Sequence, residues 1–522
     1  MSFTNKQRRK KNRKPFYVPH DYQAESIEFG LSRPSAGFLL APGLGKTSII
    51  LFIFRILKRL GLIDELVIFA KRRICFEVWP AEIEKWRQLR KLKYVICHGK
   101  DKEKNLLAKA DIRIINYEGL SMLAERTTTK WALTSLGKQF FRRGKRIMLA
   151  VDESSKLRHT KTARFKMMKQ CLKFFERRYI LTGSPAPNGL MNMFGQVYTL
   201  DLGESLGKFI TQFRNKYFTP AGFLGRDWLI QKGADRKIFK KLRQVVIRYG
   251  NDQLNLPPLK FIDISVNLDK KTRKLYDQME KEYIAEWKGG EVTAANAAVA
   301  SGKCRQIAQG GVYYDPDTGE IINVDALKRR TFKKKKWKRI HDAKCEALVE
   351  LLEELNGEPA LVSYEFEHDK LRLQKYFKKH AKQFAKAPFV GSGMKDKEFH
   401  KYKKMWDRGE LPVMFGQPGS IAHGLNLQGK GGIVIFFAMT WDLENYEQFI
   451  QRVWRQGQKR RVIVYRIIAN RTVDDDMIAS LAIKDHNQQT LLKAMEWRTR
   501  KDRLKRRKRS RFDKEMEMAE AA

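Results

Sequence analysis

The fold is decided by one short stretch, Ala41-Pro42-Gly43-Leu44-Gly45-Lys46-Thr47. It follows the apolar run 37–40 and opens the apolar helical pattern 47–57, the strand, loop and helix order that a phosphate-binding loop requires. Glycines let backbone N–H groups close around a phosphate, and the start of a helix favours the anion. We therefore expect this loop to hold a nucleotide, with Lys46 on the β- and γ-phosphates and Thr47 on Mg²⁺.

An acidic pair follows the apolar run 147–151. A phosphate loop needs one carboxylate that orders Mg²⁺ and another that polarises the attacking water. We expect Asp152 on the metal side and Glu153 as the general base. Adjacent acids at the end of a strand can also be plain surface charges, but their position after a phosphate loop favours the catalytic interpretation.

Short apolar runs alternate with longer helical patterns in two blocks of the chain. This rhythm predicts βαβ units and an α/β fold with mostly parallel sheets. In the first block the expected strands are 37–40, 66–69, 112–115, 147–151 and 179–181. In the second block they are 360–364, 413–415, 433–437 and 462–468.

The composition of the chain indicates a polyanionic partner. Its 522 residues include 105 Lys and Arg against 58 Asp and Glu, which gives a formal net charge of +47. Hydrophobic residues make up 43%, enough to build cores, so wholesale disorder is excluded. At roughly 100 to 200 residues per domain, the length also excludes a single small binding module.

The positive charge is concentrated in residues 6–14, 328–339 and 498–511. We interpret these runs as arms that extend an electrostatic footprint on nucleic acid. In the central run, Phe332 and Trp337 interleave with the cations and could stack on bases or sugars. The alternative for the two terminal runs is a solubility tail or an import signal.

The sequence predicts a cytoplasmic protein. The longest uncharged stretch, 179–200, contains two prolines, three glycines and two asparagines, which would leave backbone groups unpaired in lipid. The basic N-terminus lacks the apolar segment of a secretory signal. The five cysteines are widely spaced, so we expect reduced thiols in the core rather than a zinc site.

With further motifs, these residues resemble the Swi/Snf-type branch of the superfamily-two helicases and DNA translocases. The resemblance extends over about residues 17 to 497 and is most specific in Gln-Arg-Val-Trp-Arg-Gln-Gly-Gln at residues 451–458. The compact size is similar to that of bacteriophage and prophage versions. The motifs that carry the resemblance are Tyr22-Gln23, Gly43 to Thr47, Asp152 to Ser155, Leu181 to Asn188, Gly424 to Leu427 and Gln448 to Gln458.

The resemblance implies a role for each motif. Gln23 would read adenine, and Arg452 and Arg455 would neutralise charge on the γ-phosphoryl group from a second domain. Because these arginines lie three residues apart, we expect them on one helix face. The residues expected to couple nucleotide state to nucleic-acid binding are Thr182, Ser184, Gly424, Asn426 and Gln448.

Four positions depart from the family pattern. Ser154-Ser155 replaces the common Ala-His, Pro187 replaces a Gln, and Lys71 stands at a usual Pro. None of them removes a group that would touch phosphate, so the expected ATPase chemistry is unaffected.

The expected architecture is two RecA-like domains with parallel sheets, helical insertions between them and basic terminal tails. The expected boundaries are 1–16 for a basic arm, 17–200 for the ATP-binding domain, 201–340 for helical insertions and a basic linker, 341–497 for the second domain and 498–522 for a basic tail. The expected cofactors are ATP and Mg²⁺.

The expected activity is movement along, or remodelling of, duplex or branched DNA. The alternatives are a strand-separating helicase acting on DNA or RNA and a motor subunit of a replication or restriction complex. A catalytically idle scaffold should have lost at least one of five residues, and all are present: Lys46, Asp152, Glu153, Arg452 and Arg455.

Overall fold

The structure is a computed structural model that describes residues 14–187, 189–221, 227–288, 294–314, 336–391, 396–421 and 426–485, together with residues 319, 321 and 394. The described chain divides into two compact units between Asn255 and Leu256. Each unit has its own parallel sheet and its own hydrophobic core.

The first unit is built on a seven-stranded sheet in the order β11-β1-β8-β7-β2-β4-β3, and every pair in it is parallel. Its strands are β1 Ser35–Leu40, β2 Glu65–Ala70, β3 Tyr94–Cys97, β4 Ile112–Asn116, β7 Ile147–Asp152, β8 Arg177–Thr182 and β11 Val246–Tyr249. Its helices are α2 Asp21–Leu31, α3 Lys46–Arg59, α4 Arg72–Lys85, α5 Lys102–Leu107, α6 Ser135–Phe141, α7 Ala163–Cys171, α8 Met193–Asp201, α9 Ile210–Tyr217 and α10 Ala234–Leu242.

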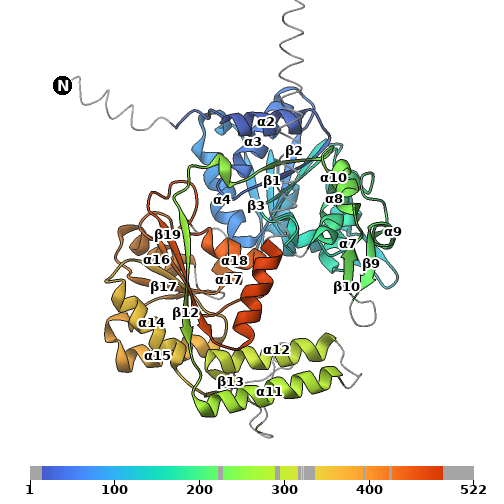
Figure 1. The fold of residues 1–522 in the computed structure, drawn as a ribbon. Helices are drawn as coiled ribbons and strands as arrows, with labels where there is room; N and C mark the ends of the chain where they lie inside the picture. Colours follow the sequence, from blue (N-terminus) through green and yellow to red (C-terminus); the bar gives the residue numbers. More distant parts are fainter. Residues whose placement is uncertain are drawn as a thin grey trace, which may run out of the picture. The chain divides into compact units, whose positions relative to one another are not determined.

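Helices cover both faces of this first sheet (Figure 1). Successive side chains of a strand point to opposite faces, so neighbouring residues of β1 enter different cores. Phe38 packs into the core that includes Ile49 and Phe54 of α3, whereas Leu39 packs into the core that includes Val197 of α8. Burial on both faces explains why the strands read as continuous apolar runs.

The second unit contains a six-stranded parallel sheet in the order β12-β19-β18-β15-β17-β16. Its strands are β12 Leu259–Val266, β15 Ala360–Ser363, β16 Phe389–Val390, β17 Val413–Gly416, β18 Ile433–Phe436 and β19 Val462–Ala469. Its helices are α11 Lys270–Lys288, α12 Ala294–Gln309, α14 Ala343–Glu354, α15 Glu367–His380, α16 Asp396–Arg408, α17 Pro418–Ile421 and α18 Leu443–Ile450, followed by a helix over residues 473–485.

Three antiparallel pairs supplement the sheets: β5 Ala124–Arg126 with β6 Trp131–Leu133, β9 Phe218–Ala221 with β10 Asp227–Ile230, and β13 Gly311–Tyr313 with β14 Trp337–Arg339. The predicted α/β class with parallel sheets is confirmed. None of the helices in the described residues combines the length and apolar composition needed to cross a membrane.

The expected boundaries at residues 200 and 340 differ from those of the structure. Residues 201–340 are divided between the two units, because β11 pairs with β1 of the first sheet and β12 pairs with β19 of the second. Two strands of the large sheets, and the short strands β9, β10, β13 and β14, therefore lie in a region expected to hold only helices and a linker. Helices expected there are present, among them α11, which is rich in charged residues, and α12; the two helices pack side by side (Figure 1).

Candidate functional site

The candidate phosphate loop joins β1 to α3 in the first unit. Gly43 and Gly45 have φ angles of 89° and 73°, in the left-handed region that favours glycine. A Cβ atom on Gly45 would also lie only 2.4 Å from Nε2 of Gln23. The two glycines thus permit a tight loop that leads directly into the start of α3, where free N–H groups and the helix dipole favour an anion.

Lys46 is the first residue of α3, and its side chain lies across the loop. The Lys46 ammonium group donates hydrogen bonds to the carbonyl oxygens of Leu40 and Ala41 at 2.9 and 3.4 Å. Thr47 follows it and is half-buried. The loop, the cation and the hydroxyl are therefore in the order that nucleotide binding needs.

Gln23 is held against this loop by three hydrogen bonds. Its Oε1 accepts from the Tyr17 hydroxyl and from the backbone N–H of His20, both at 3.1 Å, and its Nε2 donates to the carbonyl oxygen of Leu44 at 3.2 Å. The Tyr17 ring stacks on Phe52 of α3 with 4.0 Å between ring centroids. The N-terminal segment, the glutamine and the phosphate loop thus form one connected structure.

Asp152 ends β7 at the same edge of the sheet. Its Oδ2 accepts a hydrogen bond from the indole N–H of Trp79 at 3.1 Å, and its backbone carbonyl accepts from the Tyr117 hydroxyl at 2.6 Å. Burial and the neighbouring Glu153 raise the pKa of Asp152 to about 6, although Lys46 and Lys71 act in the opposite direction. The structure thus brings Lys46 close enough to Asp152 to act on its pKa, and the sequence predicts this proximity.

Glu153 has an unusual backbone conformation. Its φ and ψ angles are 55° and 58°, in the left-handed region that a non-glycine residue seldom adopts. Such strain costs on the order of 1–3 kcal/mol and persists only where the surrounding structure enforces it. Here the Tyr117 hydroxyl also contacts the Glu153 carbonyl, at 3.2 Å, and the side chain is half-buried.

A buried bridge links the acidic motif to the segment after β8. The Ser154 hydroxyl donates to Oε1 of Gln196 at 2.7 Å. Nε2 of Gln196 in turn donates to the carbonyl oxygens of Pro185 at 2.6 Å and Asn192 at 2.9 Å. Sequence reasoning missed Gln196; the one signal was a single amide side chain in the apolar helix α8.

Two of the expected coupling residues lie close to this bridge in the sequence. Thr182 ends β8 and is fully buried, and its hydroxyl has no hydrogen-bond partner among the described residues. Ser184 is also buried. A Cβ atom on the intervening Gly183 would lie 3.1 Å from Pro42, so this segment packs closely against the phosphate loop.

The remaining expected residues lie in the second unit, except that Gly424 is outside the described residues. The expectation of one helix face for the arginine pair is wrong, because α18 ends at Ile450 and residues 451–457 form turns and a bend. Arg452 is buried and donates through Nε to the carbonyl oxygen of Gln448 at 2.9 Å. Arg455 is half-buried and donates to Oδ1 of Asn426.

The environments of these side chains differ. Burial lowers the pKa of Arg455 to about 10, still high enough for a charged guanidinium at neutral pH. Gln448 is buried and donates to Glu444 at 3.2 Å. Gln458, which closes the most specific motif, donates to the carbonyl oxygens of Gly431 at 2.7 Å and Val453 at 3.2 Å. Gln458 therefore stabilises the turns of its own unit.

The donor set of the first unit fits Mg²⁺. Within the part of the chain that the structure describes, no group of three or more His, Cys, Asp or Glu side chains could enclose a metal. Mg²⁺ does not need such a cage when it is held by one or two carboxylates, a hydroxyl, water and the phosphates of a nucleotide. Thr47 and Asp152 are the residues of this unit that would supply the hydroxyl and the carboxylate.

Comparisons with known proteins identify relatives of both units. Residues 22–309 match the SNF2-related domain, and residues 343–457 match the helicase conserved C-terminal domain. The putative protein p41 of Acyrthosiphon pisum secondary endosymbiont phage 1 is 29% identical over 92% of this chain and 99% of its own length. The uncharacterized ATP-dependent helicase YqhH of Bacillus subtilis is 20% identical over 90% of this chain and 79% of its own.

Among solved structures, the Sulfolobus solfataricus SWI2/SNF2 ATPase core in complex with dsDNA is similar to this chain. It is 18% identical with a TM-score of 0.40, and the match covers 93% of this chain and 95% of the other.

Proposed function

Because the chain belongs to the SNF2-related family of helicase-like ATPases, we propose that it is a motor that couples hydrolysis of Mg·ATP to movement along duplex or branched DNA. One observation carries the proposal: the phosphate loop with Lys46 and the carboxylate of Asp152 lie at one edge of the first sheet, within electrostatic reach of each other. The carboxyl edge of a parallel α/β sheet is where such proteins bind their ligands.

Each residue of the first unit has a proposed task. Gln23 contacts adenine, Lys46 neutralises the β- and γ-phosphates, and Thr47 and Asp152 hold Mg²⁺. The metal would supply charge stabilisation on the phosphate oxygens. Glu153 is the general base that orients and deprotonates the attacking water. Its strained backbone conformation sets the direction in which the side chain leaves the main chain.

Arg452 and Arg455 belong to the second unit. We propose that hydrolysis is coupled to movement because the ATP site of the first unit needs these arginines for turnover. Arg452 and Arg455 would stabilise the γ-phosphoryl charge, and a planar guanidinium suits that task. Turnover then requires both units, so binding and loss of ATP change how they act together. In the first unit, the Ser154–Gln196–Pro185 bridge would carry the change from the acidic motif to the segment after β8.

DNA is the proposed track. The net charge of +47 supports a polyanionic partner. A motor that binds the phosphates of duplex DNA can move without opening base pairs. Unstacking the bases would cost roughly 1.4 kcal/mol per base-pair step. Similarity to a phage protein over nearly its full length supports a phage-encoded chain that acts in the cytoplasm of the host.

The test measures steady-state ATPase without nucleic acid and with single strands, duplexes, forks and RNA, beside triplex displacement and unwinding of a tailed duplex. We expect duplex DNA to stimulate ATPase at least as well as single strands, and triplex displacement to exceed unwinding. Lys46→Ala is the inactive control. Efficient unwinding without triplex displacement would replace this proposal by a strand-separating helicase, and preference for RNA would replace DNA as the track.

A further inference from the structure

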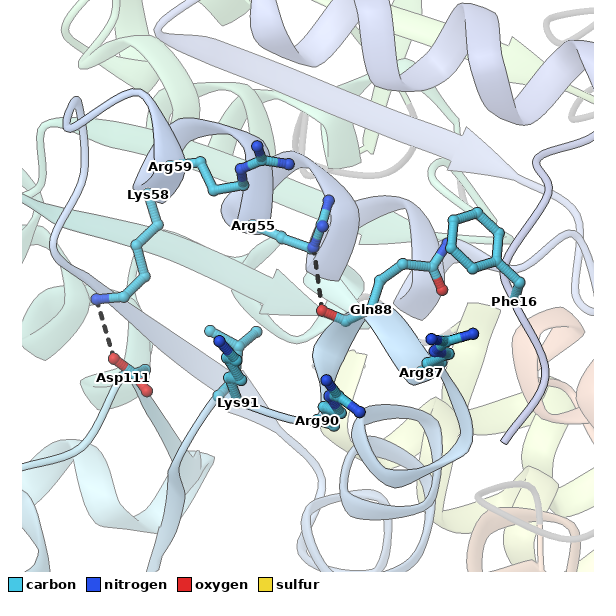
Figure 2. Close-up of a pocket in the computed structure, with 10 residues that line it drawn as sticks. Phe16, Arg55, Lys58, Arg59, Arg87, Gln88, Arg90, Lys91 and Asp111 are labelled. Carbon is cyan, nitrogen blue, oxygen red and sulfur yellow. Dashed lines mark hydrogen bonds and ion pairs between the residues drawn. The ribbon is translucent and has the colours of Figure 1, made fainter. Parts of the chain in front are cut away.

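The first unit contains a second charged site, a pocket of about 670 Å³ that we call the basic pocket (Figure 2). Its lining combines one carboxylate, Asp111, with the aromatic ring of Phe16. Its cationic side chains are Arg55, Lys58, Arg59, Arg87, Arg90 and Lys91.

The basic pocket lies at the opposite edge of the sheet from the candidate ATP site. Lys46 begins α3, whereas Arg55, Lys58 and Arg59 lie in its last turns. At 1.5 Å per residue, the two ends of this helix are about 20 Å apart. Asp111 directly precedes β4, so it marks the amino edge of the sheet, away from the carboxyl edge that holds Asp152. The pocket is therefore separate from the nucleotide chemistry.

Few of its cations are neutralised. Lys58 pairs with Asp111 at 2.9 Å and also donates to the carbonyl oxygen of Asp64 at 2.7 Å. Arg55 donates to the carbonyl oxygen of Gln88 at 3.1 Å, and partial burial together with Arg59 lowers the pKa of Arg55. Within the described ranges, no ion pair is formed by four side chains: Arg59, Arg87, Arg90 and Lys91. Clustered like charges repel, so the pocket gains from a bound anion.

The backbone on both sides of Phe16 is held beside these cations, and Phe16 itself is 65% exposed. The backbone N–H of Arg87 donates to the carbonyl oxygen of Pro15 at 3.0 Å. The Gln88 side chain accepts from the backbone N–H of Tyr17 at 2.9 Å and donates to its carbonyl oxygen at 3.0 Å. Residues on both sides of Phe16 are thus bonded to the short helix Arg87–Leu89, and Figure 2 shows the ring at the Gln88 end of the pocket.

We propose that the basic pocket binds a single-stranded segment of nucleic acid, whose phosphates contact Arg59, Arg87 and Arg90 and one of whose bases stacks on Phe16. Guanidinium groups match phosphate geometry, and an aromatic ring beside cations is typical of sites for unpaired strands. A duplex could satisfy the cations, but its bases are already stacked.

The test uses the full chain without ATP and measures binding of a labelled oligonucleotide by fluorescence anisotropy over a range of salt. One variant combines Arg59→Ala, Arg87→Ala and Arg90→Ala. The matched control combines Arg236→Ala, Lys237→Ala and Lys240→Ala, three exposed cations on α10 of the same unit. A third variant is Phe16→Ala. ATPase without nucleic acid and the melting temperature check that each variant is folded.

We expect the pocket variant to lose about 2 units of the log–log salt slope for single strands, at about 0.7 per lost phosphate contact, and the control to lose less. Phe16→Ala should weaken single-strand binding about tenfold and leave duplex binding unchanged. Equal slope losses in both triple variants, or equal effects of Phe16→Ala on single strands and duplexes, would overturn the proposal. Displacement of the oligonucleotide by pyrophosphate at constant ionic strength would assign the pocket to small phosphate compounds instead. Because no ATP is present, failure here leaves the proposed motor function standing.

Discussion

At Glu153 the backbone is strained and the side chain is half-buried, and such strain motivates the hypothesis that the residue serves chemistry. We predict that Glu153→Gln keeps ATP-analogue binding and lowers kcat by about 10² to 10⁴, because it keeps the shape and removes the base. Single-turnover hydrolysis and analogue binding measure the two effects. Glu125→Gln, an exposed change in β5, should leave both ATP-analogue binding and kcat unchanged. Turnover in the Glu153 variant near the wild-type rate would show that another group activates the water.

The Tyr17 hydroxyl donates to Gln23, the residue that we propose contacts adenine. We predict that Tyr17→Phe raises KM for ATP about fivefold with little change in kcat, because it deletes the hydroxyl that positions Gln23 and keeps the ring on Phe52. The size follows from about 1 kcal/mol for one net hydrogen bond. Tyr94→Phe removes a surface hydroxyl that bonds to Glu84 and is the control. An unchanged KM would mean that Gln23 does not need this support to bind ATP.

The roles of residues could be predicted from the sequence where neighbouring residues serve one chemical purpose. A backbone that closes around a phosphate requires particular residue types from Gly43 to Thr47, so this loop could be identified without a structure. Gln196 and Phe16 were not, because their partners are distant in the sequence. Ser154 lies 42 positions from Gln196, and the Tyr17 backbone is bonded to a side chain 71 positions away.

Among the elements, α8 supplies a link that no motif describes. We predict that Gln196→Leu lowers the free energy of unfolding by about 1–3 kcal/mol, since it leaves Ser154 and Pro185 without their buried partner. We also predict that it reduces DNA-stimulated kcat about tenfold while ATPase without DNA stays near the wild-type value. Denaturant titration and ATPase assays with and without duplex DNA provide the measurements.

The control for Gln196 is Thr199→Val in the same helix. Thr199 is equally buried, but its hydroxyl donates only within α8, to the carbonyl oxygen of Gly195. The Thr199→Val variant should lower the free energy of unfolding and leave the stimulation of ATPase by DNA intact. Equal loss of stimulation in both variants would show that α8 matters for packing and does not transmit the nucleotide state.

The strands that were predicted lie in the regular alternation of apolar runs and helical patterns, whereas β11 lies outside it and was missed although it is buried along its whole length. The expected strands in both blocks are present, because strands covered on both faces must be apolar throughout. β12 was missed because the polar residues Lys260, Asp263 and Ser265 interrupt its apolar run, as an edge strand allows. The turns that carry Arg452 and Arg455 were mistaken for helix, since spacing alone cannot show that α18 ends at Ile450.

At the scale of the whole molecule, the division between Asn255 and Leu256 could not be placed from the sequence. The region between residues 200 and 340 has the charged helical composition of an insertion. Two of its strands nevertheless complete the edges of different sheets, and strand pairing over long sequence distances leaves no local pattern. Each unit consequently has a complete sheet and core of its own, which favours independent folding.

Independent folding gives a prediction about which steps the first unit can perform alone. Residues 1–255 expressed alone should fold and bind an ATP analogue, because the loop, Gln23 and Asp152 are all present. Their turnover should be at least about 10³ below that of the full chain, because Arg452 and Arg455 are absent and loss of an arginine finger costs that much. Full-length Arg455→Ala, which leaves the track-binding surfaces in place, is the matched comparison and should lose a similar factor in kcat. Hydrolysis by residues 1–255 at the full-length rate would remove the second unit from the chemistry and with it the proposed link between ATP turnover and movement.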